Sequence, residues 1–261
     1  MDTSTTRRVF ATDALRDQVI LVTGGSRGIG AAIALACADA GADVAVGYRQ
    51  GRDEAEAIVD SITTRGREAL AFQADVSKPD EVDVMIKDVL GHFGRIDGLV
   101  NNAGLMPESP VARMTIEEWK HVIDVDLTGA FLCTRATLPG MLERKSGSIV
   151  MISSRLGQIG FAGVAHYAAA KAGMIALAKS LAKEVGREGV RVNVVAPGVT
   201  ITDMTTDITK GDTGERRLAE LPLGRFATAE EVADSVVFLL SDAGILYHGQ
   251  TLCPNGGGHM P

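Results

Sequence analysis

The chain has 261 residues, of which 46% are hydrophobic and 23% are charged, and its formal net charge is −7 at pH 7. This composition is typical of a packed globular protein and excludes an intrinsically disordered chain. A net acidic chain without a cluster of Lys and Arg is not expected to bind nucleic acid, because neutralising phosphates requires such clusters. The longest stretch without charge, residues 243–261, contains several glycines and polar side chains, so no membrane span is expected.

Cysteine spacing and the N-terminal composition give two further expectations. Cys37, Cys133 and Cys253 are far apart and match neither a disulfide framework nor a zinc spacing, so we expect reduced thiols and no metal site. Residues 1–16 carry basic and acidic side chains and lack an apolar run, which fits neither a secretory signal nor an acid-poor transit peptide. We expect a flexible arm over residues 1–16, a single domain over residues 17–261, and a cytoplasmic location.

From residue 17 onward, short apolar runs alternate with longer segments of helical period. Strands are predicted at residues 19–22, 43–46, 69–72, 96–100, 149–152, 190–196 and, as a final edge strand, 250–253. Helices are predicted at residues 29–40, 53–65, from 79 onward, from 115 to 143, from 163 to 186, and from 228 onward. The strands are almost continuously apolar, which is typical of a parallel sheet buried on both faces. The pattern therefore predicts an α/β chain with one doubly wound parallel sheet and helices on both faces.

Polar residues mark where three of these helices begin. Ser77 is a candidate N-cap before Pro79, since proline suits the first helical turn. Thr115 and Thr228 are each followed three residues later by Glu, which is the capping-box pattern.

A glycine-rich segment, residues 23–30, lies between the first predicted strand and an Ala-rich helix. Glycines there allow a tight turn and a close approach of the backbone to a ligand, and the helix N-terminus offers free N–H groups to an anion. The structural alternative is a simple tight turn, but the position after the first strand of an alternating pattern favours a dinucleotide site.

Several motifs in order give the chain a specific resemblance to the short-chain dehydrogenase/reductase family, over residues 17–258. The residues that carry the resemblance are Thr23, Gly24, Gly28, Gly30, Asp75, Val76, Asn101 to Gly104, Ser154, Tyr167, Lys171, Pro197 and Gly198. Residues 167–171, 194–198 and 222–225 resemble most the 3-oxoacyl-(acyl carrier protein) reductases of that family. The resemblance implies a single-domain, Rossmann-like fold and reduction of a ketone with a nicotinamide cofactor.

The choice between the two nicotinamide cofactors depends on the end of the second strand. A carboxylate there would repel the 2′-phosphate of NADP, but the segment reads Tyr48, Arg49, Gln50. Arg27 and Arg49 suit bidentate phosphate contact, although either could be an ordinary surface arginine. Because the resemblance places both beside the adenosine ribose, NADP(H) is the expected cofactor. The resemblance implies that it is bound by Gly24, Ser26, Arg27, Gly28, Ile29, Gly30, Tyr48, Arg49, Asp75, Val76, Asn102, Ala103, Gly104, Tyr167, Lys171, Pro197, Gly198, Val199 and Thr202.

The expected reacting centre combines Ser154, Tyr167 and Lys171. Tyr167 and Lys171 are four residues apart on a predicted helix and so share one face. Spacing alone favours a structural i,i+4 pair, but Ser154, thirteen residues before Tyr167 at the end of a predicted strand, reverses this preference. A nearby ammonium should lower the pKa of a phenol and so suit it to acid–base catalysis. The resemblance implies that Ser154 binds the substrate carbonyl, with Ser153 as the competing candidate for that role.

Asp126 is a departure from the family pattern. The family places Asn in the corresponding Val-Asn-Leu segment, where its backbone carbonyl holds a water that relays protons to the lysine. A backbone role tolerates Asp, whereas an ionised side chain accepts hydrogen bonds and cannot donate them. Asp126 near Lys171 would keep the ammonium charged and could tune Tyr167 less strongly, with an altered pH dependence.

The substrate is less well defined than the chemistry. Residues 200–221 are polar, with a composition expected of a mobile lid. Arg144 and Lys145 could serve a carrier protein at the mouth, but Glu188 stands where carrier-protein reductases usually have Arg. A free 3-oxoacyl thioester, a small cyclic ketone, and a sugar or polyol remain open as substrates. A non-catalytic NADP-binding regulator is the alternative of another class.

The resemblance also implies a homotetramer, built on the helices at residues 115–143 and 163–186 and on the C-terminal strand. His92, His121 and His166 are expected to be surface or packing residues, since none has a second ligand at a metal spacing.

Overall fold

A computed structural model describes residues 10–260, which contain one seven-stranded parallel sheet with the order β3-β2-β1-β4-β5-β6-β7. The strands are β1 (Val19–Thr23), β2 (Asp43–Tyr48), β3 (Ala69–Gln73), β4 (Gly98–Asn101), β5 (Gly147–Ile152), β6 (Val190–Val195) and β7 (Thr251–Leu252). The adjacent strands pair in parallel register, from Val19 opposite Asp43 to Val195 opposite Leu252. The predicted fold class is confirmed.

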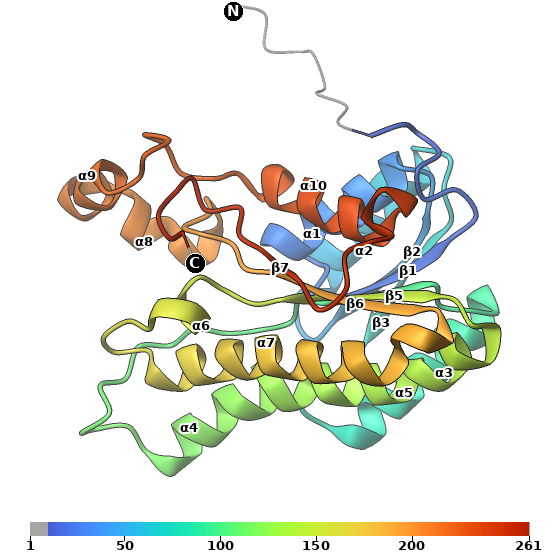
Figure 1. Cartoon of the computed structure of the whole chain (residues 1–261), viewed down its shortest axis with the longest axis horizontal. Coiled ribbons are helices and arrows are strands. Elements are labelled where there is room, and N and C mark those ends of the chain that lie inside the picture. The colour runs from blue at the N-terminus through green and yellow to red at the C-terminus, as the bar shows by residue number, and fades with distance from the viewer. Residues whose placement is uncertain (1–9, 261) are drawn as a thin grey trace, which may run out of the picture.

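Helices cover both faces of the sheet (Figure 1). One face carries α1 (Gly28–Asp39), α2 (Arg52–Thr63) and α10 (Ala229–Leu240), and the other α3 (Pro79–Phe93), α5 (Gly129–Arg144) and α7 (Ala165–Val185). Two apolar clusters, one on each side of the sheet, form the core. The five residues of β1 are all buried, because side chains on both faces of the strand meet helices.

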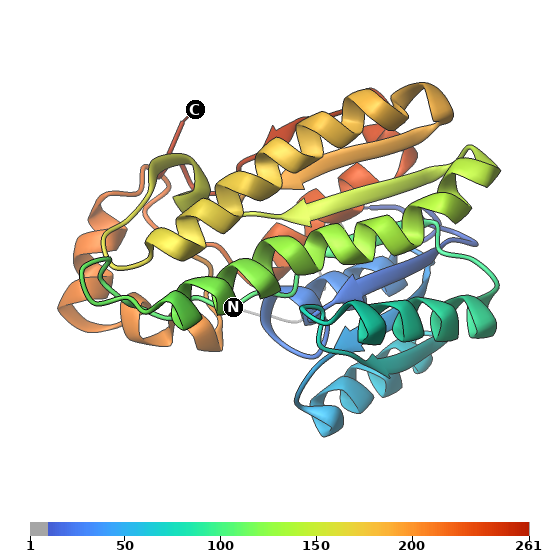
Figure 2. The ribbon, with the colours of Figure 1, turned by 90° about the horizontal axis from the view of Figure 1, so that it is seen from below.

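The long helix predicted at residues 115–143 is interrupted by a π-helical segment. It consists of α4 (Ile116–Ile123), the π-helix over Asp124–Thr128, and α5, which runs beside α7 in Figure 2. A π-helical turn adds a residue to the turn and redirects the side chains that follow it. This interruption lies at Asp126, on the stretch of the chain that faces the carboxyl end of the sheet.

Two of the three predicted helix caps are confirmed. Thr115 Oγ1 accepts a hydrogen bond from the amide of Glu118 at 3.1 Å, and Thr228 makes the equivalent bond with Glu231 at 3.3 Å. The prediction for Ser77 was wrong, because its hydroxyl donates to Asp75 Oδ1 at 2.7 Å and the residue preceding α3 is Lys78.

The expected lid, residues 200–221, contains two short helices, α8 (Thr206–Thr209) and α9 (Gly211–Ala219). They lie beyond the carboxyl ends of the strands, near α6 (Leu156–Ile159) (Figure 1).

The predicted N-terminal arm is partly incorporated into the packed core. Leu15 is fully buried, and its amide donates to the carbonyl of Ala40 at 2.8 Å, so packing begins before residue 17. Residues 1–9 of the predicted arm lie outside the described part of the chain. Between residues 10 and 260, no helix combines the length and apolar character needed to cross a bilayer.

Candidate active site

A cavity of about 550 Å³ opens at the carboxyl ends of the strands. It lies around the point where the strand order reverses between β1 and β4, which is the usual ligand-binding position in a doubly wound sheet. Every residue that the sequence analysis assigned to the cofactor or to catalysis lies on its wall. The structure therefore brings the sequence-predicted residues together in one place, and their individual roles stay predictions.

The glycine-rich loop connects β1 to α1 at one end of this cavity. Gly24 and Gly28 have φ angles of +64° and +56°, in the left-handed region that favours glycine. A Cβ atom on Gly30 would overlap the carbonyl oxygen of Gly24 and the side-chain amide of Asn102. The loop thus forms a close-packed cradle at the N-terminus of α1, with the shape and the free N–H groups that suit a pyrophosphate.

Asn102 links the end of β4 to this loop by hydrogen bonds. Its side-chain amide donates to the carbonyl oxygens of Thr23 at 3.0 Å and Gly24 at 3.1 Å. The hydroxyl of Thr23 in turn accepts from the amides of Asn102 and Ala103, at 3.0 and 3.1 Å. Asn102 therefore fixes the shape of the cradle, in addition to lining the cavity.

The loop after β1 and the end of β2 supply the basic residues expected for the adenosine ribose. Arg27 and Arg49 both line the cavity, and Arg49 Nη1 lies 3.5 Å from Asp75 Oδ2. Partial burial opposes ionisation of Asp75, but two hydrogen bonds from Ser77, followed by the charge of Arg49, hold the pKa of this carboxyl below its ordinary value. The long Arg49–Asp75 contact leaves most guanidinium donors of Arg49 available to a phosphate.

Ser154 and Tyr167 face the other end of the cavity. Ser154 Oγ accepts from the amide of Leu156 at 3.1 Å, which holds the serine in the turn between β5 and α6. The hydroxyl of Ser154 acts on Tyr167 in the direction that lowers the pKa of the phenol. Ser153 is buried, and its hydroxyl donates to the carbonyl of Lys171 at 2.7 Å, so it anchors α7 to β5. This contact favours Ser154 over Ser153 as the substrate-facing hydroxyl.

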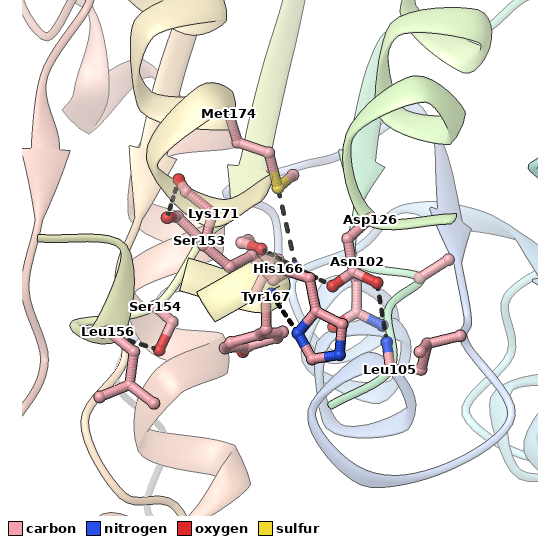
Figure 3. A network of polar contacts seen from close by, with 12 residues as sticks. Asn102, Leu105, Asp126, Ser153, Ser154, Leu156, His166, Tyr167, Lys171 and Met174 are labelled. Carbon is pink, nitrogen blue, oxygen red and sulfur yellow. Dashed lines mark hydrogen bonds and ion pairs between the residues drawn. The ribbon is translucent and has the colours of Figure 1, made fainter. Parts of the chain in front are cut away.

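Lys171 and Asp126 form a buried ion pair next to Tyr167 (Figure 3). Lys171 Nζ lies 3.1 Å from Asp126 Oδ2, donates to the carbonyl of Ile152 at 3.0 Å, and sits 5.5 Å from the centre of the Tyr167 ring. Asp126 Oδ1 accepts from the amide of Leu105 at 2.9 Å. Burial disfavours the ammonium of Lys171, but Asp126 and then Tyr167 outweigh burial and hold the pKa of Lys171 above its ordinary value.

The net pKa of Tyr167 is raised, so the lowering expected from Lys171 is outweighed by other contributions. Burial of the phenol is the largest cause, and the carboxylate of Asp126 acts in the same direction. Lys171 and Ser154 lower the pKa, as expected, but do not outweigh the other two. Burial and the charge of Asp126 therefore favour the neutral phenol of Tyr167 in this site.

Other polar residues lie outside this arrangement. Arg144 donates to the carbonyl of Ile96 at 2.7 Å, and Ile96 lies just before β4. Glu188 lies just before β6. Both lie at the amino ends of the strands, opposite the cavity, so the prediction that Arg144 and Lys145 flank its mouth was wrong. The described residues contain no group of His, Cys, Asp and Glu that could hold a metal ion.

Sequence reasoning missed some of the cavity wall. Leu105, Met106, Arg155, Leu156, Met204, Ile208 and Arg217 also line the cavity. The position of Arg155, immediately after Ser154, was a signal available in the sequence. Arg217 was not identifiable, because it reaches the cavity only through the fold of α9.

The known proteins that resemble this chain are reductases and dehydrogenases. A family model described as enoyl-(acyl carrier protein) reductase matches residues 24–259. A 3-oxoacyl-(acyl carrier protein) reductase from Synechocystis is 49% identical over 245 residues, which is 94% of this chain and 98% of that protein. One from Staphylococcus aureus is 45% identical over 240 residues, or 92% of this chain and 97% of that protein. Among solved structures, a short-chain dehydrogenase from Burkholderia cenocepacia in complex with NADP has a TM-score of 0.88 and 34% identity, covering 94% of this chain and 99% of that chain.

Proposed function

Because the chain belongs to the short-chain dehydrogenase/reductase family, we propose that it is an NADPH-dependent reductase that converts a ketone into an alcohol. The observation that carries the proposal is the meeting of Ser154, Tyr167 and Lys171 at one end of a cavity whose other end is the glycine-rich cradle. Two relatives are 3-oxoacyl-(acyl carrier protein) reductases, which favours a 3-oxoacyl group attached to a carrier protein as substrate.

The residues of the cavity fit a dinucleotide. The cradle at residues 24–30 would hold the pyrophosphate, Arg27 and Arg49 a 2′-phosphate, and Lys171 the hydroxyls of the nicotinamide ribose. Asp75 and Val76 would lie against the adenine, and residues 197–199 with Thr202 against the nicotinamide. When bound, the cofactor supplies the hydride that reduces the ketone carbon.

Tyr167 would act as the general acid. Its neutral phenol donates a proton to the carbonyl oxygen as negative charge develops there, and Ser154 stabilises the same oxygen by a hydrogen bond. The raised pKa keeps the proton on the phenol at the working pH, as reduction requires, and makes the phenol a weaker acid than Lys171 alone would make it.

Asp126 would act on Tyr167 through Lys171. Its carboxylate keeps the buried lysine charged and partly cancels the field of that lysine at the phenol. We expect the consequence to be an enzyme suited to ketone reduction, in which alcohol oxidation requires a higher pH.

We also propose a homotetramer. The α4–α5 face exposes Trp119 and Phe131, and the segment before β7 exposes Ile245 and Leu246, the last at 91%. Exposed aromatic and aliphatic side chains at both of the expected contact regions support this assembly.

A substrate panel tests the proposed function most broadly. NADPH oxidation is measured with a 3-oxoacyl thioester on its carrier protein, the same acyl group on a short thiol, a cyclic ketone and a keto sugar. We expect turnover with the 3-oxoacyl substrates. The proposal fails if every ketone is inert while the protein still binds NADPH.

A further inference from the structure

A buried arginine lies directly beside the proposed carbonyl-binding serine. Arg155 follows Ser154 at the start of α6, lines the cavity, and is only 9% exposed. Its amide donates to the carbonyl of Pro197 at 3.0 Å, which fixes its backbone against the end of β6. Its side chain therefore lines the same cavity as the hydroxyl of Ser154.

The charge of Arg155 lacks a close counter-ion. Within residues 10–260, no carboxylate comes within 4.0 Å of its guanidinium, and its side-chain hydrogen bond goes to the carbonyl of Gly258 at 3.3 Å. A guanidinium has five N–H donors, so one carbonyl leaves most of them unused. Burial and the nearby charge of Arg217 lower the pKa of Arg155, whereas Glu220, which is exposed, opposes this only weakly. Burying a guanidinium without a nearby carboxylate costs free energy unless a bound anion pairs with it.

A second arginine reaches the same part of the cavity from the lid. Arg217 lies on α9, is half-buried, lines the cavity, and has its guanidinium 5.1 Å from the centre of the Phe161 ring. Arg155 and Arg217 line the same cavity and carry like charges, so an anion between them would offset the repulsion and complete both sets of donors.

We propose that the substrate itself carries a carboxylate, which Arg155 binds and Arg217 covers from the lid. This inference rests on the proposed ketone reduction and departs from the carrier-protein substrate that the names of the relatives favour, because the carboxyl carbon of a 3-oxoacyl thioester is bonded to sulfur and bears no free carboxylate. A phosphate on a pantetheine arm is the other source of negative charge, but that arm separates its phosphate from the thioester by more than ten bonds. Arg155 lines the same cavity as Ser154, so a carboxylate on the reacting acyl or alkyl group is the anion that can occupy the cavity together with the ketone.

The experiment compares a 3-oxo acid with its methyl ester, for example acetoacetate with methyl acetoacetate, in the NADPH-dependent reaction. We expect wild-type protein to prefer the carboxylate, and Arg155→Gln to lower the carboxylate-to-ester ratio of kcat/KM by about tenfold or more, mainly through KM. Arg155→Lys should keep part of the wild-type ratio, and Arg217→Gln should lower the ratio less than Arg155→Gln does.

The matched control is Arg216→Gln, since Arg216 is the exposed neighbour of Arg217 on α9 and contacts only the carbonyl of Asp212 within its own helix. It should leave the ratio at the wild-type value.

Three outcomes would overturn the proposal. In the first, the wild-type protein prefers the ester. In the second, Arg155 affects turnover only when the charged substrate is a thioester that carries a pantetheine phosphate, and not when it is a free carboxylate. The third is an Arg155→Gln variant that slows both substrates equally and melts at a lower temperature, which would show that Arg155 only anchors Gly258. If no ketone is reduced at all, the proposed function fails instead. The carboxylate site is then tested by calorimetric binding of butanedioate to the NADPH-bound protein, where Arg155→Gln should abolish binding and persistent binding would contradict the site.

Discussion

At the scale of single residues, Asp126 is the feature that most distinguishes this site from its family pattern. The carboxylate forms an ion pair with Lys171 at 3.1 Å and raises the pKa of Tyr167. An asparagine at this position would be neutral and would leave the positive charge of Lys171 uncompensated at the phenol. The substitution therefore gives the site a lysine that is more firmly charged and a tyrosine that gives up its proton less readily.

The pH dependence of Asp126→Asn tests this account. Removing the carboxylate should lower the pKa of Tyr167, because one of the two causes that raise it is gone. Ketone reduction needs the neutral phenol, so kcat/KM should begin to fall at a pH roughly one unit lower than in the wild type. Alcohol oxidation needs the phenolate and should become active at a correspondingly lower pH. Asp124→Asn, on the exposed side of the same π-helical segment, is the control, and an Asp126→Asn profile that matches the wild type would refute the tuning.

Arg49 should determine the choice of cofactor. Its guanidinium lines the cavity and is held only loosely by Asp75 at 3.5 Å. In Arg49→Glu, a carboxylate would repel the 2′-phosphate and accept from a free 2′-hydroxyl, so the ratio of kcat/KM for NADPH over NADH should fall by about tenfold or more. Arg52→Gln is the matched control, because Arg52 pairs with Glu56 outside the cavity. A wild-type preference for NADH would contradict the assignment.

At the scale of elements, the glycine-rich loop and α1 depend on the absence of a side chain at Gly30. Gly30→Ala would push a methyl group into the carbonyl of Gly24, so the cradle must open. We expect NADPH binding to weaken by about tenfold or more and the protein to unfold at a lower temperature. Gly91→Ala in α3, where a Cβ meets nothing within 4 Å, should instead stabilise the protein by about 0.5–1 kcal/mol. Equal NADPH affinity in Gly30→Ala and wild type would show that the loop does not hold the pyrophosphate.

The elements also show where sequence patterns were sufficient and where they were not. Buried strands such as β1 and capping boxes such as that of Thr115 were predictable, because hydrophobic period and local hydrogen bonding determine them. The π-helix at Asp124–Thr128 was not, because no hydrophobic period or capping pattern in the sequence marks it. Ser77 was misassigned because its hydroxyl could bond either to the first turn of the helix or to Asp75. It bonds to Asp75, and this contact depends on the conformation of the loop after β3.

Within the site, the sequence predicted which residues meet but not the balance of charge among them. The resemblance was enough to place Ser154, Tyr167 and Lys171 on one wall. The raised pKa of Tyr167 was missed, because it depends on depth of burial and on the side-chain contact between Lys171 and Asp126. Neither quantity has a periodic signature in the sequence.

At the scale of the whole molecule, one sheet brings together residues that are far apart along the chain. The cradle follows β1, Arg49 follows β2, Asn102 follows β4 and Ser154 follows β5, so the carboxyl ends of parallel strands collect them at one edge. The opposite edge carries Arg144 and Glu188, which accordingly have no contact with the cavity.

The assembly in solution is a prediction for the intact molecule. Size-exclusion chromatography with light scattering should give the mass of four chains. Phe131→Asp, on the exposed face of α5, should reduce that mass because a charge in an apolar contact is costly to bury. Wild-type protein that elutes as a single chain would contradict the proposed tetramer.

The most direct test of the account is the paired measurement of ketone reduction and NADPH affinity in Tyr167→Phe. The phenylalanine keeps the ring against Lys171 but has no proton to donate, so we expect kcat to fall by at least about a thousandfold. The Kd for NADPH, measured by fluorescence titration, should stay within a few fold of the wild type. Turnover at the wild-type rate in this variant would contradict the central claim that the phenol of Tyr167 is the proton donor.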